Sequence, residues 1–124
     1  MDTLIIESSP KTPHVIFNAD TGELLLEGRS IPENSLEFYV PLMELLESYS
    51  YEVKAETIVQ MKLEYFNTSS SKCLVEIFRK LERIHEEGHK VQINWFFEED
   101  DEDMEESGED FQEIIDVPIL MKTL

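Results

Sequence analysis

Residues 57–66 are the most constraining stretch of this chain, because apolar and polar side chains alternate along them. A period of two places successive side chains on opposite faces of a β-strand. The pattern therefore predicts a long strand with one covered face and one wetter face, within a sheet that carries another layer on its apolar side. One face would carry Thr57, Val59, Met61, Leu63 and Tyr65, and the other Gln60, Lys62 and Glu64.

A second helix is predicted to follow this strand at once. The polar run Asn67–Ser71 ends the strand, and Gly88 ends the helix. Hydroxyl side chains at a helix start commonly cap the free backbone N–H groups, so the run is typical of a helix cap. The apolar stripe of the helix repeats at intervals of three and four residues. Its members are Leu74, Ile77, Phe78, Leu81 and Ile84.

The other elements are shorter. A first helix begins at Asn34 or Ser35. Pro41 inside its pattern predicts a kink, or else a regular part limited to one side of Pro41. Phe111, Ile114 and Ile115 suggest a short amphipathic helix, which Pro118 ends. Strands are expected at residues 3–7, 14–18, 23–27 and 91–97, with a possible last edge strand at 119–121.

This order predicts an α/β fold of two layers. Right-handed strand–helix–strand crossovers give parallel neighbours, whereas the initial hairpin makes the sheet mixed. We therefore expect a mixed β-sheet of about five strands with helices mainly on one face, formed by residues 1–124 as a single domain. The face opposite the helices would expose Phe66 and Phe96, a candidate contact surface.

The charge of the chain is uneven. The net charge is −18, which argues against binding to nucleic acid or to an anionic membrane surface. Residues 98–116 contain twelve Asp and Glu and no Lys or Arg, so the rest of the chain carries only −6 (−18 + 12). We expect residues 98–110 to form a mobile acidic loop, or else a docking surface for a basic partner. The run lacks the glycine and the spaced ligands of a calcium loop.

Several features predict a cytoplasmic protein. It has no apolar run long enough to span a membrane and no basic, apolar leader at its N-terminus. Its single cysteine, Cys73, fits a reducing compartment, and its place beside the helical stripe predicts a half-buried, inert thiol.

No catalytic group, cofactor site or metal site is predicted. His85 and His89 lie four residues apart, but Gly88 ends the helix between them and no further ligand motif accompanies them. No base is identifiable that would activate a hydroxyl in the Thr68–Ser71 run. That run nevertheless suits a phosphoryl group, because the N–H groups and the dipole at a helix N-terminus favour negative charge. Capping and phosphorylation are compatible on the same turn.

Three segments resemble one known family. The stretch Leu63–Lys72, with its core Asn-Thr-Ser-Ser-Ser-Lys, is similar to the signature of the SiaC family of bacterial phosphoproteins. The stretches Gly28–Asn34 and Gly88–Trp95, the latter leading into the acidic run, resemble that family too. The resemblance covers essentially the whole chain.

This resemblance implies a fold similar to STAS domains and anti-sigma-factor antagonists, and a function without enzymatic activity. It implies that Thr68 is phosphorylated by a kinase related to anti-sigma-factor kinases, and that a metal-dependent phosphatase reverses this. The unphosphorylated form would bind and activate a diguanylate cyclase, which promotes cyclic di-GMP synthesis and biofilm formation. We expect Asn67, Ser69, Ser70 and Lys72 to shape the contacts with the kinase and partner.

Two other readings stay open at this point. The first is an antagonist in another partner-switching circuit, such as sigma-factor control. The second is an enzyme that holds a metal with its acidic segment.

Overall fold

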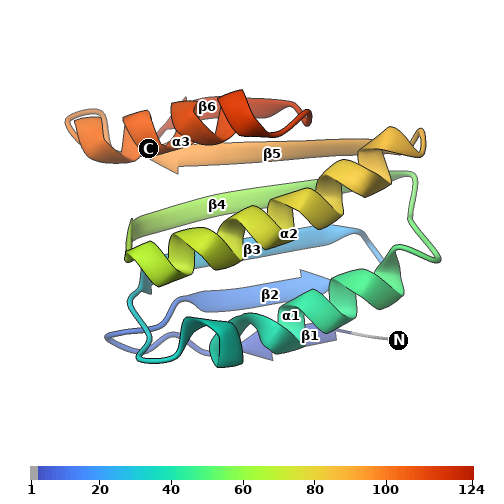
Figure 1. Ribbon diagram of the computed structural model, residues 1–124, viewed down its shortest axis with the longest axis horizontal. Coiled ribbons are helices and arrows are strands. Elements are labelled where there is room, and N and C mark those ends of the chain that lie inside the picture. Colours follow the sequence, from blue (N-terminus) through green and yellow to red (C-terminus); the bar gives the residue numbers. More distant parts are fainter. Residues whose placement is uncertain (1–2) are drawn as a thin grey trace.

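A computed structural model describes residues 3–124, which form one mixed sheet of six strands with three helices (Figure 1). The α/β class and the two layers are confirmed, although the sheet has six strands where about five were predicted. The sixth is the possible edge strand near the C-terminus. The elements are β1 (Thr3–Ile6), β2 (His14–Asn18), β3 (Glu23–Ser30), α1 (Ser35–Tyr49), β4 (Glu56–Phe66), α2 (Thr68–Glu86), β5 (Lys90–Phe97), α3 (Glu102–Ile114) and β6 (Ile119–Thr123).

The strands lie in the sheet in the order of the sequence, from β1 at one edge to β6 at the other. The β1–β2 and β2–β3 pairs are antiparallel, and the β3–β4, β4–β5 and β5–β6 pairs are parallel. Each parallel connection contains one helix, and all three helices cover the same face of the sheet (Figure 1). As a result, α1, α2 and α3 all begin beside the C-terminal ends of the parallel strands.

The core lies between the helices and this face. The largest side chains that are almost completely buried there include Trp95, Tyr39, Phe17 and Phe78. Pro41 lies inside α1 at an exposed position, and the helix continues on both sides of it, so Pro41 does not limit the regular part to one side. No helix within residues 3–124 combines the length and the apolar content that crossing a bilayer requires.

A β-bulge near the end of β4 changes the predicted faces. Gly28 pairs with Leu63 and Arg29 with Tyr65, so Glu64 is an extra residue opposite β3. Tyr65, predicted to be covered, is therefore 53% exposed. Phe66 turns to the helix side, where its ring lies 6.1 Å from that of Trp95. The expected exposure of Phe66 is thus wrong.

The acidic segment contains a helix where a loop was predicted. Asp101 caps α3 by accepting a hydrogen bond from the Met104 N–H at 3.0 Å, and acidic residues in the first turn suit the positive end of the helix. Met104, Gly108 and Phe111 form the buried side of α3. The short helix predicted near residues 111–115 is only the C-terminal part of this longer one.

Candidate functional site

Thr68 is the first residue of α2. This helix begins on the side of the sheet where all three helices begin, beside the C-terminal ends of the parallel strands (Figure 1). Asn67 joins this helix directly to the end of β4. The Asn67 N–H donates to the carbonyl oxygen of Ser30, at the end of the neighbouring strand β3, at 3.0 Å. The turn that carries Thr68 is therefore fixed to two strands of the sheet.

Asn67 is the cap of α2, so the prediction that the Thr-Ser-Ser-Ser hydroxyls cap this helix is wrong. The Asn67 Oδ1 accepts a hydrogen bond from the Ser70 N–H at 2.9 Å. The Ser69 hydroxyl also donates to Oδ1, at 3.2 Å. The Asn67 side chain thus caps the helix, and the hydroxyl groups of residues 68–71 are available for other contacts.

Ser70 belongs to a buried network of hydroxyl groups beneath the turn. Its side chain is completely buried, and its hydroxyl donates to the carbonyl oxygen of Ser30 at 3.0 Å. The Ser30 hydroxyl lies 2.8 Å from that of Ser70 and 2.6 Å from that of Tyr39. Burial raises the pKa of Tyr39 to about 12, although its hydrogen bond to Ser30 opposes the shift. The network therefore holds the start of α2 against β3 and α1.

Ser35 and Ser69 connect the starts of the two helices. Their hydroxyl oxygens lie 2.7 Å apart, and the Ser35 hydroxyl is also 3.3 Å from that of Ser70. Ser35 is buried, whereas Ser69 is exposed. The position of the α2 turn therefore depends on α1 as well as on β3.

Thr68 differs from its neighbours because its side chain is exposed and makes no hydrogen bond to any of residues 3–124. The N–H groups in the first turn of a helix have no acceptor within the helix, and Asn67 serves only that of Ser70. A phosphoryl group on Thr68 would find backbone donors and a favourable dipole at this end. Lys72, exposed one turn further on, is placed to meet the same charge.

A groove of about 650 Å³ lies beside this turn, between the first halves of α1 and α2. Leu36, Met43 and Cys73 give it an apolar lining, and Leu36 is 62% exposed. Cys73 itself is buried, more fully than predicted, and this burial raises the pKa of its thiol, with a smaller contribution from Glu76. An apolar groove with an exposed leucine, close to an exposed threonine, makes this end of the molecule suitable for a protein contact.

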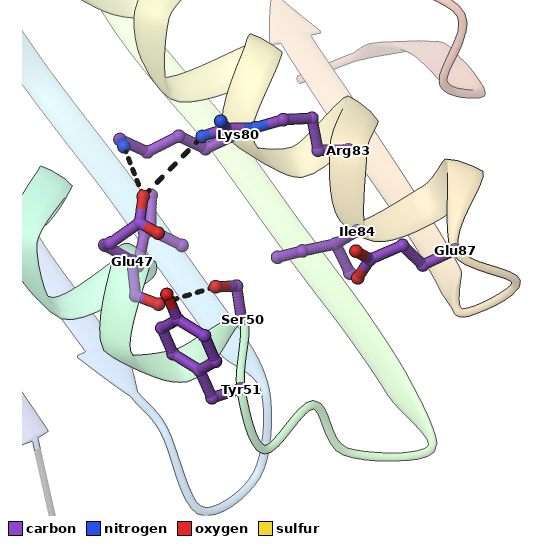
Figure 2. Close-up of a pocket in the computed structure, with 8 residues that line it drawn as sticks. Glu47, Ser50, Tyr51, Lys80, Arg83, Ile84 and Glu87 are labelled. Carbon is purple, nitrogen blue, oxygen red and sulfur yellow. Dashed lines mark hydrogen bonds and ion pairs between the residues drawn. The ribbon is translucent and has the colours of Figure 1, made fainter.

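The opposite ends of the same two helices are held together by charges (Figure 2). Glu47 of α1 lies 2.9 Å from the Lys80 Nζ and 3.6 Å from the Arg83 guanidinium, both on α2. The hydrogen bond and the charge of Lys80 hold the pKa of Glu47 below its usual value. These groups line a pocket of about 200 Å³, and they already pair with one another across it.

The structure separates the predicted partner-binding residues into two groups. Ser69 and Lys72 are exposed and line the groove, and Thr68 is exposed next to Ser69. Ser70 is buried and can act only through the position of the turn. Asn67 is half-buried and serves mainly as the cap. Sequence reasoning missed the hydroxyl contacts of Ser30 and Ser35, whose partners on α2 lie 40 and 34 residues away. It also missed the hydrogen bond of Tyr39 to Ser30 and the exposed side chains of Leu36 and Tyr65.

The histidine pair and the acidic segment were the other candidate metal ligands. The Nδ1 atom of His85 lies 3.3 Å from the carbonyl oxygen of His89, so the loop after α2 brings this ring to a backbone oxygen. Within residues 3–124 no three His, Cys, Asp or Glu side chains are arranged to hold one metal ion.

An exposed threonine, fixed at a helix start by a buried network and flanked by an apolar groove, is a site suited to modification and to partner binding. This is the class of the regulatory phosphoproteins. A family model described as "SiaC family regulatory phosphoprotein" matches residues 6–124, and the chain belongs to the SiaC family.

Relatives from Pseudomonas aeruginosa cover nearly the whole chain. An uncharacterized protein of strain UCBPP-PA14 is 29% identical over 98% of this chain and 97% of its own length. The crystal structure of apo-SiaC is similar with a TM-score of 0.90 at 29% identity, over 98% of this chain and 99% of that one. SiaC in the crystal structure of the diguanylate cyclase SiaD with its activator SiaC is similar with a TM-score of 0.92 at 28% identity, with the same coverage.

Proposed function

We propose that this protein is a non-enzymatic phospho-switch in the cytoplasm, whose unphosphorylated form binds and activates a diguanylate cyclase. The observation that carries the proposal is the likeness, over nearly the full length, to the SiaC that is the activator of SiaD in their complex. Phosphorylation of Thr68 by a kinase related to anti-sigma-factor kinases would end this binding, and a metal-dependent phosphatase would restore it. The cyclic di-GMP that the cyclase makes would promote biofilm formation.

The position of Thr68 supports this mechanism. A phosphoryl group adds a charge of about −1.5 to −2. The free N–H groups of the helix start tolerate that charge, so the fold remains intact. At a protein contact the same group must lose its hydration, which costs several kcal/mol unless a cation of the partner receives it. The switch thus acts at the interface and requires no refolding.

The surrounding residues divide the remaining roles. The apolar groove and Tyr65 offer contact area to the cyclase, and Ser69 and Lys72 border the modified side chain. Lys72 can pair with the phosphate in the same chain, which would hold the modified side chain over the groove. Asn67 and Ser70 position the turn from below.

The test uses the full-length diguanylate cyclase of the source organism, with binding followed by calorimetry and activity by cyclic di-GMP formation. Thr68→Asp and the phosphorylated protein should bind at least about 100-fold more weakly than the unmodified protein, a change of about 2.8 kcal/mol. Thr68→Ala should bind and activate within about threefold of wild type, because the Thr68 side chain makes no contact that the fold requires.

Ser48→Asp is the matched control, since it adds the same charge at an exposed position near the far end of α1. It should bind like wild type. Equal binding by Thr68→Asp, the phosphorylated protein and wild type would show that Thr68 is not the switch. Recovery of an anti-sigma factor in place of a cyclase from a lysate of the same organism would favour the sigma-factor alternative.

A further inference from the structure

The four hydroxyl side chains at the start of α2 differ in how accessible they are. Ser70 is completely buried, and Ser71 is half-buried. Thr68 and Ser69 are both exposed, and of these two only Thr68 makes no hydrogen bond to any of residues 3–124. A kinase that reaches this turn therefore meets two exposed hydroxyl groups on neighbouring residues, one free and one engaged.

The Ser69 hydroxyl is engaged both as a donor and as an acceptor. It donates to the Asn67 Oδ1 at 3.2 Å, which leaves its oxygen to accept from the Ser35 hydroxyl, 2.7 Å away. Ser35 is only 3% exposed and belongs to the neighbouring helix α1. Because successive residues of a helix are about 100° apart around its axis, Ser69 faces α1 while Thr68 faces solvent.

We propose that Ser35 determines which of these two hydroxyl groups is phosphorylated, by holding that of Ser69. The inference rests on the proposed phosphorylation of Thr68. In that reaction the Thr68 oxygen attacks the terminal phosphorus of a nucleoside triphosphate, the nucleoside diphosphate leaves, and the hydroxyl proton passes to a base of the kinase. The attacking group must turn its oxygen to the donor and release its proton. Thr68 can do both without breaking a hydrogen bond to the described part of the chain.

Ser69 must break two hydrogen bonds to react in the same way. One hydrogen bond of ordinary strength corresponds to about a fivefold change in rate. Two such bonds make Ser69 roughly 30-fold slower than a free hydroxyl group at this turn. Ser35 is the partner that can be removed without disturbing the helix start, since Asn67 also caps α2.

The experiment uses the folded full chain with its cognate kinase and ATP, and fragmentation mass spectrometry assigns the phosphate to a residue. Wild type should be phosphorylated at Thr68. Thr68→Ser should be phosphorylated at residue 68 nearly as fast, which excludes the difference between threonine and serine as the cause of selectivity. Thr68→Ala should be phosphorylated at Ser69 roughly 30-fold more slowly than wild type at Thr68.

The decisive comparison adds Ser35→Ala to Thr68→Ala. The double variant should be phosphorylated at Ser69 about fivefold faster than Thr68→Ala alone, because one of the two bonds to the Ser69 hydroxyl is gone. Thr68→Ala/Asn34→Ala is the matched control. It removes the cap of α1 at the adjacent residue, whose side chain bonds to Glu37 and not to Ser69. This control should be phosphorylated at Ser69 at the rate of Thr68→Ala.

Two results would overturn the role of Ser35 while leaving Thr68 as the modified residue. One is an equal rate at Ser69 with and without Ser35→Ala, and the other is an equal gain from Asn34→Ala, which would reflect a general loosening of the helix start. A wild type that is phosphorylated at neither Thr68 nor Ser69 would contradict the proposed function, and this inference with it.

Discussion

The starts of α1 and α2 are built on the same plan. Each follows the C-terminal end of a parallel strand, on the same side of the sheet (Figure 1). Each is capped by an asparagine side chain. The Asn34 Oδ1 accepts from the Glu37 N–H at 3.1 Å, and the Asn67 Oδ1 accepts from the Ser70 N–H at 2.9 Å. Since asparagine caps both helices, no hydroxyl at either start is needed for capping.

The two starts differ in the residue after the cap. In α1 this residue is Ser35, which is buried and bonded to α2 through Ser69. In α2 it is Thr68, which is exposed. The same local geometry thus fixes one hydroxyl inside the molecule and presents the other to solvent. The position of Thr68 is therefore set by the hydrogen bonds of Asn67, Ser69 and Ser70, while its own side chain remains exposed.

The strongest test of this contrast is Ser70→Ala. The substitution removes the hydroxyl that donates to the Ser30 carbonyl and contacts the Ser30 hydroxyl. Unfolding in urea should show a loss of about 1–3 kcal/mol, because buried polar groups lose partners. Ser71→Ala, on the next residue of α2 and only half-buried, should change stability by less than about 0.5 kcal/mol. Equal losses in the two variants would mean that the buried network does not hold the turn.

The sequence predicted most of the fold because its strands and its first two helices have clear periodicities. The helix α3 was foreseen only at its C-terminal end, because a run of acidic residues hides its stripe. The stripe also includes Gly108, where a Cβ atom would lie 2.6 Å from Cδ1 of Trp95. A close contact that depends on a missing side chain leaves no apolar signal in the sequence.

The site was only partly predictable for a related reason. The polar run after β4 marks Thr68 as a position at a helix start, but residue types cannot show which of its hydroxyls is buried. That depends on Ser30, which is 40 residues from Ser70 in the sequence, and on the bulge at Glu64 that turns Tyr65 outward. Contacts of this range follow from the packing of the whole sheet.

The next test measures how stability depends on pH through Tyr39, the residue of α1 in the buried hydroxyl network. Below pH 10, Tyr39 is protonated in both the folded and the unfolded protein. Between pH 10 and about 12 the unfolded chain has lost this proton while the folded protein keeps it, so stability falls as the pH rises through this window. At pH 11 the loss is about 1.4 kcal/mol.

Urea unfolding of wild type and Tyr39→Phe at pH 8 and pH 11 measures this difference. At pH 8 the variant should be less stable by about 1 kcal/mol, since it lacks the hydrogen bond to Ser30. At pH 11 this gap should have closed, because only the wild type carries the pH dependence of Tyr39. A gap of constant size would show that Tyr39 ionises as readily in the folded protein as in the unfolded chain.

The two asparagine caps offer a direct comparison of the two starts. Asn34→Ala and Asn67→Ala should each lower the stability by about 1 kcal/mol, the usual effect of losing a helix cap. Asn67→Ala should also weaken cyclase binding, because Asn67 orders the turn beside Thr68, whereas Asn34→Ala should affect binding less. A cap that proved neutral in either helix would mean that a neighbouring hydroxyl replaces it, most directly Ser69 in the case of Asn67.

The smallest expected effect on stability is that of Thr68→Ala. Its side chain is exposed and makes no hydrogen bond to residues 3–124, so the free energy of unfolding should change by less than about 0.5 kcal/mol in urea. Ser35→Ala, at the equivalent position of α1, should cost more, about 1 kcal/mol, because its hydroxyl contacts Ser69 and Ser70. If Thr68→Ala proved as costly as Ser35→Ala, Thr68 would be part of the fold, and a modification there would act by disturbing the structure instead of blocking an intact interface.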